Sequence, residues 1–469
     1  MESDTIAAIA TPAGSGGIGI IKISGNAAND IAERIFKQRE NLKPAAPEAD
    51  PPLRNESHRL SYGHIYDPKT GKILDEVLLA RMRANQSYTR ETIVEINAHG
   101  GPAVVRAILA LVLRYGARLA EPGEFTKRAY LNGRIDLTQA EAIVDIITAR
   151  SQKALEIAAL QLKGGLRERI EAIRDELLET LVTVEAGIDF PEEVPSAETA
   201  DGLRERLKGT IAGEMDVLIR QYEDGHIYRD GIRLVVLGKP NVGKSSLVNR
   251  LLERDRVIVT AVPGTTRDII EENLVLHGMP VVISDTAGLR QTTDPVEMAG
   301  IRKTEAAIEQ ADVLLFVLDA ASPATEEDRW IYGRIRDKQT VVVYNKTDLI
   351  GESPGSVQQE DWAGRPSSAV SALGNTGIGE LRSVLARVCE GKTPNGDDDR
   401  LVPNLRQARL LADGRNAVEA AVSAIDEGLP AELIAIDLKD GLRALDDILG
   451  NAVGADLLSG IFDRFCIGK

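Results

Sequence analysis

A glycine-rich segment at residues 238–245 constrains the fold of this chain more than any other feature. It reads Gly238-Lys-Pro-Asn-Val-Gly-Lys244-Ser245 and follows an apolar run, Ile232 to Leu237, that is typical of a buried strand. The glycines let backbone N–H groups curl around phosphates, and the start of the following helix adds positive potential. Lys244 can reach the β- and γ-phosphates, and Ser245 can ligate Mg²⁺. The segment therefore predicts a phosphate-binding loop in a domain built on a parallel sheet.

Two further motifs stand at the ends of later apolar runs and identify the nucleotide. Asp285-Thr-Ala-Gly288 places a carboxylate near Mg²⁺ and a glycine amide near the γ-phosphate. In Asn345-Lys-Thr-Asp348 the aspartate can accept both N1–H and N2–H of guanine, whereas adenine would leave the buried carboxylate unpaired. Ser371-Ala-Leu373 stands where such domains close over the base. This order of strand-end motifs predicts a GTP-binding domain.

The motifs together supply a set of expected GTP contacts. These are Asn241, Val242, Gly243, Lys244, Ser245, Ser246, Asp285, Thr286, Ala287, Gly288, Asn345, Lys346, Asp348, Ser371, Ala372 and Leu373.

The residue that orients the attacking water is not evident from these motifs. Leu289 stands where Ras-type GTPases place a glutamine, and a leucine side chain cannot orient water. Glu297 follows a few residues later, and its spacing alone favours a solvated acid at the start of a helix. Since no arginine finger is evident in cis, another cation must offset the charge that develops during hydrolysis.

Composition excludes several classes of protein. The chain has 469 residues, a length typical of about three domains. Its net charge of −16 disfavours a protein that coats nucleic acid by charge alone. Aromatic residues, at 4%, are too scarce for a base-stacking single-strand binder, and two cysteines cannot build a disulfide framework. The acidic start resembles no leader, and no apolar run reaches the ~18–20 residues of a membrane span. We expect a cytoplasmic protein without a membrane segment.

The residue pattern changes three times along the chain. Residues 1–123 predict a small α+β domain, with strands at 5–10, 18–23, 62–66, 77–82 and 92–97, a polar loop at 43–52, and a helix at 102–115. Residues 124–225 have a helical period, interrupted at Gly164-Gly165 and at 189–193, which predicts a bundle. Thr138-Gln-Ala-Glu141 predicts a capping box at its start.

The remaining residues complete a multidomain architecture of α/β and α domains. Residues 226–388 form the predicted P-loop (Ras-like) G domain, with strands at 232–237, 281–284, 313–318 and 341–344. A polar linker at 391–400 precedes more helical sequence, so residues 389–469 form the second part of the helical domain. The G domain is thus expected to be inserted into the helical domain.

The whole set of motifs resembles the MnmE (TrmE) family of tRNA-modification GTPases. The resemblance covers essentially the whole chain: Ala10-Thr-Pro-Ala-Gly, Glu121-Pro-Gly-Glu-Phe, Pro263-Gly-Thr-Thr-Arg-Asp268, Asp285-Thr-Ala-Gly-Leu-Arg290 and the terminal Phe465-Cys-Ile-Gly-Lys469. The tail and the Gly-Thr-Thr-Arg-Asp segment together are specific to this family.

The resemblance implies a K⁺ ion that activates hydrolysis, in place of an arginine finger, when two G domains meet across their nucleotides. By position, Asn241, Thr260, Val262 and Thr265 would surround K⁺, and Thr266 would join Ser245 at Mg²⁺. Thr260, Thr265 and Thr266 thereby join the expected GTP contacts. Glu297 matches the family's water-orienting glutamate, which overturns the interpretation from spacing alone.

The resemblance also implies a 5-formyl- or methylene-tetrahydrofolate bound in residues 1–123, a domain that would also dimerise. By position, Lys22, Glu95, Arg134 and Lys469 would contact the folate. A pterin ring suits a carboxylate that takes two parallel N–H bonds, and cations suit the folate carboxylates. Lys22 stands where arginine is more familiar, and Tyr88-Thr-Arg-Glu91 replaces a pattern that usually contains Thr-Gly-Glu, so this loop is expected to differ.

Three other features have a less specific interpretation. Gly14-Ser-Gly16-Gly-Ile-Gly19 matches a dinucleotide motif, but β-branched residues follow it where a helix is needed. Cys466 is more typical of a buried apolar residue than of a nucleophile. His99 is expected at a strand end or in a loop rather than in a metal site, because no His and Cys cluster has zinc spacing.

The first functional hypothesis is a dimeric, K⁺-stimulated GTPase that modifies the wobble uridine of tRNA. The resemblance implies an FAD-dependent partner (GidA/MnmG), a heterotetramer with it, and an (carboxymethyl)aminomethyl group added at C5 with a one-carbon unit from the folate. The alternative is a ribosome-assembly or signalling GTPase without modification chemistry, which the G-domain motifs alone do not separate from the first. A folate enzyme with a vestigial G domain is disfavoured, because every nucleotide-contacting motif is intact.

Overall fold

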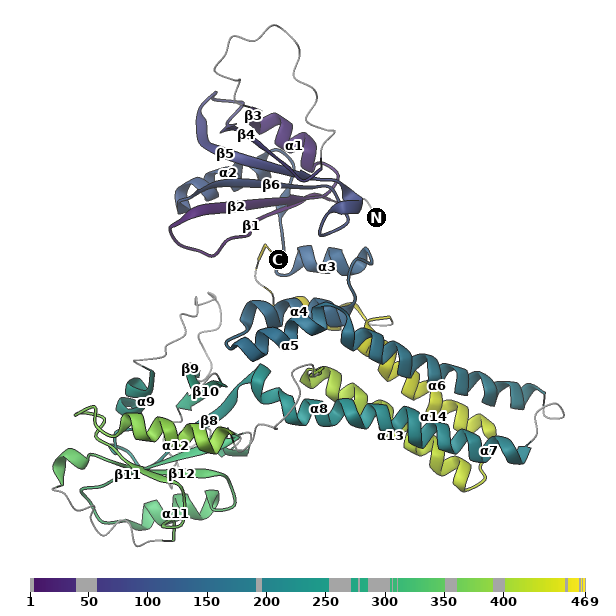
Figure 1. Cartoon of the computed structure of the whole chain (residues 1–469). Helices are drawn as coiled ribbons and strands as arrows, with labels where there is room; N and C mark the ends of the chain where they lie inside the picture. The colour runs from purple at the N-terminus through teal and green to yellow at the C-terminus, as the bar shows by residue number, and fades with distance from the viewer. Residues whose placement is uncertain are drawn as a thin grey trace, which may run out of the picture. The chain divides into compact units, whose positions relative to one another are not determined.

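The computed structural model describes residues 4–38, 57–190, 196–252, 271–276, 279–285, 304–305, 307–309, 311–350, 361–390, 401–451, 454–463, 465 and 467–468. The chain divides into two compact units, residues 1–144 with 446–469 and residues 145–445 (Figure 1). The loop expected at 43–52 and the linker expected at 391–400 lie outside the described residues.

The first unit contains a seven-stranded sheet with the order β3-β4-β5-β6-β2-β1-β7. Its strands pair antiparallel, except that β1 and β7 are parallel. The elements are β1 Ile6–Ile9, β2 Gly16–Ser24, α1 Ala28–Ile35, β3 Phe36–Gln38, β4 Arg59–Tyr66, β5 Ile73–Met82, the 3₁₀ turn η2 Ala84–Gln86, β6 Ile93–Gly100, α2 Pro102–Arg114, β7 Arg118–Leu119, α3 Glu124–Leu131, most of α4 Leu137–Thr148, and α15 Ala455–Phe462.

One face of this sheet is covered by α1 and α2. Alternate strand residues such as Ile21, Ile23 and Leu79 pack there against Ile31 of α1 and Ile108 of α2. The five strands and the helix predicted in this region are confirmed. Four elements were missed, α1, β3, β7 and α3, because each spans eight residues or fewer and shows too little periodicity to identify.

The other face of the sheet carries exposed apolar side chains. Tyr62 on β4 pairs with Leu78 on β5, and both side chains are 42% exposed. Leu60 is 60% exposed and Ile18, at the start of β2, is 65% exposed. Because neighbouring residues on these strands enter the core beneath α1 and α2, these side chains lie on the opposite face.

The capping box predicted at Thr138 and Glu141 is wrong. The residue that caps α4 is Asp136, whose Oδ1 accepts from the Gln139 backbone N–H at 3.0 Å. The Gln139 side chain accepts from the Asp136 N–H at 3.1 Å, and Thr138 Oγ1 donates to Asp136 Oδ1 at 2.6 Å. α4 therefore begins two residues earlier than predicted, and the capped amide is that of Gln139 rather than that of Glu141.

The second unit combines long helices with a six-stranded sheet of order β13-β12-β11-β8-β10-β9. The helices before the sheet are α5 Gln152–Leu162, α6 Gly165–Asp189, α7 Ser196–Glu205, the π-helical segment η3 Arg206–Ala212 and α8 Gly213–Asp230. The sheet region contains β8 Ile232–Leu237, α9 Lys244–Leu252, β9 Glu271–Leu276, β10 Met279–Asp285, β11 Val313–Asp319, α11 Glu326–Ile335, β12 Thr340–Asn345, the 3₁₀ turn η4 Thr347–Leu349, β13 Ser367–Ala369 and α12 Ile378–Glu390. α13 Leu405–Asp426 and α14 Ala431–Leu449 follow.

Helices that precede the sheet region in the sequence pack against helices that follow it. α13 lies along α8 and η3, and Gly414 of α13 comes close to Gly441 and Ala444 of α14 and to Met215 of α8. The breaks expected at Gly164-Gly165 and after Asp189 are confirmed; Gly164 precedes α6 with a φ of +97°. No helix among the described residues is long and apolar enough to span a membrane.

The strands of the second unit supply two cores. Leu234 and Val236 of β8 face the core beneath α9 and α12, whereas Val235 and Leu237 face the core beneath α11. This double burial explains why β8, β11 and β12 are near-continuous apolar runs, and it confirms the predicted parallel strands. β9 was missed; it is an antiparallel edge strand that begins with two glutamates.

Candidate functional site

The strand-end motifs meet at one edge of the six-stranded sheet. Asp285, the last residue of β10, pairs with Val236 near the end of β8. Asn345, the last residue of β12, pairs with Asp319 at the end of β11. These strands are parallel, so their carboxyl ends lie together, as expected for a ligand site of an open α/β sheet.

The loop after β8 has a backbone that requires its glycines. Gly238 has a φ of +146°, and a Cβ there would lie 2.3 Å from the Val317 carbonyl oxygen. Gly243 has a φ of +93°, and a Cβ there would lie 2.3 Å from Asn345 Nδ2. α9 begins at Lys244, which places Ser245 and Ser246 in its first turn, where backbone N–H groups remain free for an anion.

Lys244 closes over this loop. Its Nζ donates to the carbonyl oxygens of Gly238 at 2.8 Å and of Lys239 at 3.0 Å. Lys239 Nζ in turn donates to Asp328 Oδ2 at 3.0 Å, and Asp328 is almost fully buried at the start of α11. The sequence reasoning missed this second lysine, because no sequence pattern links Lys239 to Asp328, which is 89 residues away.

Asn345 joins the phosphate loop to the loop after β13. Its Nδ2 donates to the Val242 carbonyl oxygen at 2.8 Å, and its Oδ1 accepts from the Ala372 N–H at 3.0 Å. Asp348 accepts a hydrogen bond from Ser371 Oγ at 2.5 Å. The structure thus brings together the predicted residues of the phosphate loop, the Asn-Lys-Thr-Asp segment and the Ser-Ala-Leu segment.

Two further residues at this end of the sheet, Lys346 and Asn241, have left-handed backbone conformations. Lys346 has a φ of +67°, and its Nζ forms an ion pair with Asp319 Oδ2 at 2.7 Å. Asn241 has a φ of +62° and is exposed in the phosphate loop. Several predicted residues lie outside the described part of the chain: Thr260, Val262, Thr265, Thr266, Thr286, Ala287, Gly288 and Glu297. Only the backbone of Asp285 is described.

A second cluster of predicted residues lies on the open sheet face of the first unit. Lys22 on β2 stands directly opposite Glu95 on β6, and their Nζ and Oε1 atoms are 3.7 Å apart. Arg134, just after α3, places its guanidinium carbon 4.7 Å from the centre of the Tyr88 ring. Lys22 Nζ is 5.7 Å from the same ring centre. The cluster combines one carboxylate, two cations and an aromatic ring, which suits a planar ligand with donor and anionic groups.

Tyr88 is the residue of this cluster that sequence reasoning did not assign to the site. Its hydroxyl group lies 3.0 Å from Thr126 Oγ1. Burial raises the pKa of the Tyr88 phenol, against the opposing effects of Thr126 and Arg134, so the ring stays neutral. Lys469 and Cys466 lie outside the described residues, but Ile467 pairs with Pro122 in the same unit.

The loop that carries Tyr88 is held by buried charges. Arg128 of α3 bonds Glu91 through Nη1 at 3.0 and 3.2 Å, and Glu124 through Nη2 at 3.0 Å. Ser24 Oγ donates to Glu91 Oε2 at 2.8 Å. Arg90 has a φ of +57°, so it adopts the backbone region that favours glycine. Sequence reasoning missed Arg128 because it did not identify α3.

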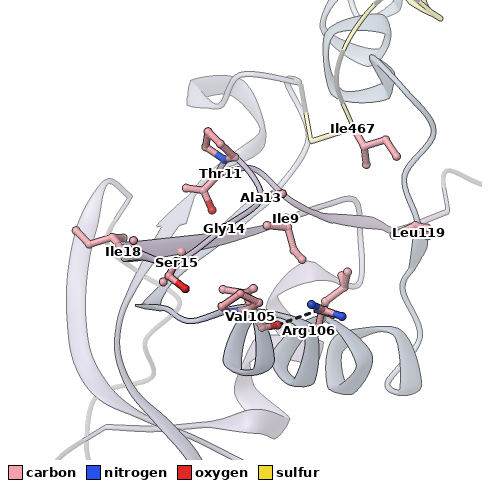
Figure 2. Close-up of a pocket in the computed structure, with 16 residues that line it drawn as sticks. Ile9, Thr11, Ala13, Gly14, Ser15, Ile18, Val105, Arg106, Leu119 and Ile467 are labelled. Atoms are coloured by element: carbon pink, nitrogen blue, oxygen red, sulfur yellow. Dashed lines mark hydrogen bonds between the residues drawn. The ribbon is translucent and has the colours of Figure 1, made fainter. Parts of the chain in front are cut away.

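The glycine motif at 14–19 lines a hollow of about 810 Å³ beside α2 (Figure 2). Its walls include Ile9, Val105 and Leu109, and Arg106 Nε donates to the Pro102 carbonyl oxygen at 3.1 Å. A Cβ at Gly19 would lie 2.3 Å from Val105 Cγ1, so this glycine lets β2 pack against α2. As predicted, a strand rather than a helix follows the start of the motif, which disfavours a dinucleotide site.

His99 lies near the end of β6, as predicted. Its Nδ1 is 2.7 Å from Asp75 Oδ1, and its backbone N–H donates to Asp75 Oδ2 at 2.8 Å. Within the described residues, no group of three or more His, Cys, Asp or Glu side chains is arranged to hold a metal ion.

Two family models and many curated proteins match this chain. Residues 5–134 match the model of the GTP-binding protein TrmE N-terminus, and residues 137–466 match the model of the MnmE helical domain. The tRNA modification GTPase MnmE of Geobacillus kaustophilus (strain HTA426) is 42% identical over 468 residues, with all of both chains covered. That of Moorella thermoacetica (strain ATCC 39073 / JCM 9320) is 44% identical over 474 residues, again with full coverage of both.

Proposed function

This chain belongs to the MnmE family of tRNA modification GTPases, and from that membership we propose that it is a potassium-activated enzyme of the tRNA wobble uridine. It is a GTP hydrolase involved in tRNA modification. With an FAD-dependent partner (GidA/MnmG), it would add an (carboxymethyl)aminomethyl group at C5 of that uridine, using a one-carbon tetrahydrofolate.

The observation that carries this proposal is that one chain contains two separate clusters of polar residues, each suited to a different ligand. A guanine-nucleotide edge is supported by the link from Val242 through Asn345 to Ala372. A folate site is supported by Lys22, Glu95 and Arg134 around Tyr88. A GTPase that only switches partners needs the first site and has no use for the second.

At the nucleotide edge, Lys244 would neutralise phosphate charge, and Ser245 with Thr266 would hold Mg²⁺. The donors proposed for K⁺ are Asn241, Thr260, Val262 and Thr265, and the exposed Asn241 side chain in the phosphate loop fits this role. The bound cation would offset the charge that develops on the phosphates during hydrolysis. Glu297 would orient the attacking water, and Asp348 would accept N1–H and N2–H of guanine.

At the folate site, Glu95 would accept two N–H bonds from the pterin, and Lys22, Arg134 and Lys469 would supply cations. The fit rests on complementary chemistry, since the carboxylate and cations of this cluster are each partly accessible beside a neutral ring. The bound folate would supply the one-carbon unit when loaded, and Tyr88 would provide a flat apolar surface beside it.

The proposed architecture is a G domain at 226–388 inserted into a helical domain at 124–225 and 389–469, after an N-terminal domain at 1–123. The packing of α13 against α8 supports the insertion, because the sheet region lies between these helices in sequence. The proposed homodimer would use the N-terminal domain, where the open sheet face exposes Leu60, Tyr62 and Leu78. A heterotetramer with the FAD-dependent partner, tRNA contact and a cytoplasmic location complete the proposal.

The alternative is a ribosome-assembly or signalling GTPase without modification chemistry. The two proposals differ in the use of the first unit. Purified protein that retains a one-carbon folate would favour the modification enzyme, whereas a switch GTPase would carry none.

The decisive experiment is steady-state GTP hydrolysis in KCl and in NaCl at equal ionic strength. A rate at least tenfold higher in KCl, which corresponds to about 1.4 kcal/mol of barrier, is expected for the proposed cation site. A nucleoside profile of a deletion strain should also lack the C5 substituent on the wobble uridine. Equal slow rates in both salts, or an unchanged nucleoside profile, would overturn the corresponding half of the proposal.

A further inference from the structure

Arg250 connects α9, the helix that follows the phosphate loop, to the loop after β13, which is expected to contact the guanine base. It lies in the last turn of α9, the helix that begins with Lys244. Its Nε donates to the Ala372 carbonyl oxygen at 2.9 Å, and its Nη2 lies 3.5 Å from the Leu373 carbonyl oxygen. The two ends of the first contact are 122 residues apart in sequence.

The loop that Arg250 contacts, residues 371–377, is here termed the base loop. It is closed by backbone hydrogen bonds between Ser371 and Thr376, at 3.0 and 3.2 Å. Gly377 has a φ of +74°, and a Cβ there would lie 2.1 Å from the Ala369 carbonyl oxygen, so the chain turns sharply at this point. Leu373 is 81% exposed at the tip, whereas Ser371 and Ala372 are buried.

The backbone N–H and carbonyl groups of Ala372 both form hydrogen bonds with side chains that are linked to the phosphate loop or to α9. Its N–H donates to Asn345 Oδ1, and Asn345 is also bonded to the Val242 carbonyl oxygen in the phosphate loop. Its carbonyl oxygen accepts from Arg250 on α9. A guanidinium donor makes a charge-assisted hydrogen bond, which is stronger than one between neutral groups. The base loop is therefore connected to the phosphate side at two points of one residue.

We propose that Arg250 is a positioning residue that couples α9 to the base loop and thereby slows the release of guanine nucleotides. The proposal rests on the proposed assignment of residues 371–373 to guanine binding. Without Arg250, the base loop would keep only the Asn345 link to the phosphate loop, so it would open more readily and the nucleotide would lose its base contacts first. Arg250 lies in the last turn of α9, whereas the free backbone N–H groups for the phosphates are in its first turn, so we expect the chemical step not to depend on it.

The test compares Arg250→Ala and Arg250→Lys in the full chain with wild type. Dissociation of a fluorescent GDP analogue is followed after mixing with excess GDP. Arg250→Ala should release it about tenfold faster, the change expected for one hydrogen bond to a charged group. Arg250→Lys retains a charged donor and should recover part of the difference. The KM for GTP should rise in Arg250→Ala, while kcat at saturating GTP changes by less than about twofold.

Arg382 provides a matched control. It lies on α12, and its Nη2 donates to the Leu251 carbonyl oxygen, so it contacts the same end of α9 from an element outside the base loop. Arg382→Ala should therefore release the GDP analogue at close to the wild-type rate. Equal acceleration in Arg250→Ala and Arg382→Ala would show general loosening of α9 and would overturn the proposal, as would a wild-type release rate in Arg250→Ala.

Failure of the proposed guanine site is distinguishable from failure of this coupling. In Asp348→Asn, GTP should lose its advantage over other purine nucleotides whether or not Arg250 matters. If Asp348→Asn keeps full guanine preference, the guanine assignment is wrong. If it loses that preference while Arg250→Ala behaves like wild type, only the coupling is wrong. Should Arg250→Ala fail to fold, the comparison of Arg250→Lys with Arg382→Lys decides the question in the same way.

Discussion

Asn345 donates a hydrogen bond to the Val242 carbonyl oxygen at 2.8 Å, across 103 residues of sequence. The side chain is almost completely buried, and its oxygen simultaneously accepts from the Ala372 N–H. One amide thus joins two loops that would otherwise be independent, and Gly243 leaves the space that this contact requires.

Asn345→Ala should lower the affinity for GDP by at least tenfold. The substitution leaves a buried carbonyl oxygen and a buried N–H without this partner, at a cost of about 1–3 kcal/mol each. Isothermal titration with GDP measures the change. Asn249→Ala is the control, because Asn249 is exposed on α9. Equal affinities in the two variants would contradict a connecting role for Asn345.

Asp348→Asn should change the base preference from guanine to xanthine. A carboxylate accepts the N1–H and exocyclic N–H of guanine, whereas an amide can donate to the carbonyl oxygen that xanthine carries at that position. Ser371 Oγ, which donates to Asp348 Oδ1, can also bond the amide oxygen. Competition of GTP and XTP for a fluorescent nucleotide measures the preference. An unchanged preference for GTP would place guanine recognition elsewhere.

Asn241→Gly should abolish the stimulation by K⁺ while leaving GDP binding intact. Glycine is the informative substitution because Asn241 has a φ of +62°, and alanine would add backbone strain of about 1–2 kcal/mol. Hydrolysis rates in KCl and NaCl are compared at saturating GTP. If the variant keeps the full K⁺ preference, the Asn241 side chain is not a ligand of the cation.

Arg128→Met should destabilise the first unit by about 3–5 kcal/mol, because it leaves the part-buried carboxylate of Glu91 without its cation and removes one of the two arginines that pair with the buried Glu124. Hydrogen exchange of peptides from β2 and α3 in increasing urea measures the local unfolding free energy. Arg167→Met removes an exposed pair with Glu171 on α6 and should cost less than about 1 kcal/mol. Similar losses in both variants would mean that the Arg128 network is not selectively stabilising.

The stability of the first unit should fall as the pH drops below about 4.5. Burial alone would raise the pKa of Glu124, but the two hydrogen bonds from Arg118 and the Glu121 N–H outweigh it, so the pKa is lowered. A lowered carboxyl pKa stabilises the fold fully above the unfolded value, about 4.3, and this contribution is lost as the pH falls through the folded value. Hydrogen exchange of β1 and α3 peptides, corrected for intrinsic rates, follows the change.

Arg118→Met is the variant that isolates this linkage. It removes the paired donors from Glu124, so its stability should be lower near neutral pH and should depend less on pH between about 3 and 5. A slope equal to that of wild type over this interval would assign the acid sensitivity to other carboxyl groups.

Contiguous motifs made it possible to predict the nucleotide site from sequence alone. A phosphate loop acts through its own backbone N–H groups and the start of the helix that follows, so eight consecutive residues carry its chemistry. Buried parallel strands can also be predicted from sequence, because residues on both faces of β8 and β11 enter hydrophobic cores and the whole run must be apolar. Local hydrogen bonding and burial on both faces each require particular residue types at neighbouring positions, which a sequence shows directly.

The tertiary structure decided the contacts between distant segments. Arg250 with Ala372, Lys239 with Asp328, and Arg128 with Glu91 each join segments whose separation in sequence carries no pattern. The start of α4 was also settled only by the structure, in which Asp136 accepts from the Gln139 N–H and from the Thr138 hydroxyl group. The physical reason is that a side-chain donor has many possible acceptors along a chain, and only packing of the whole unit selects the one within reach.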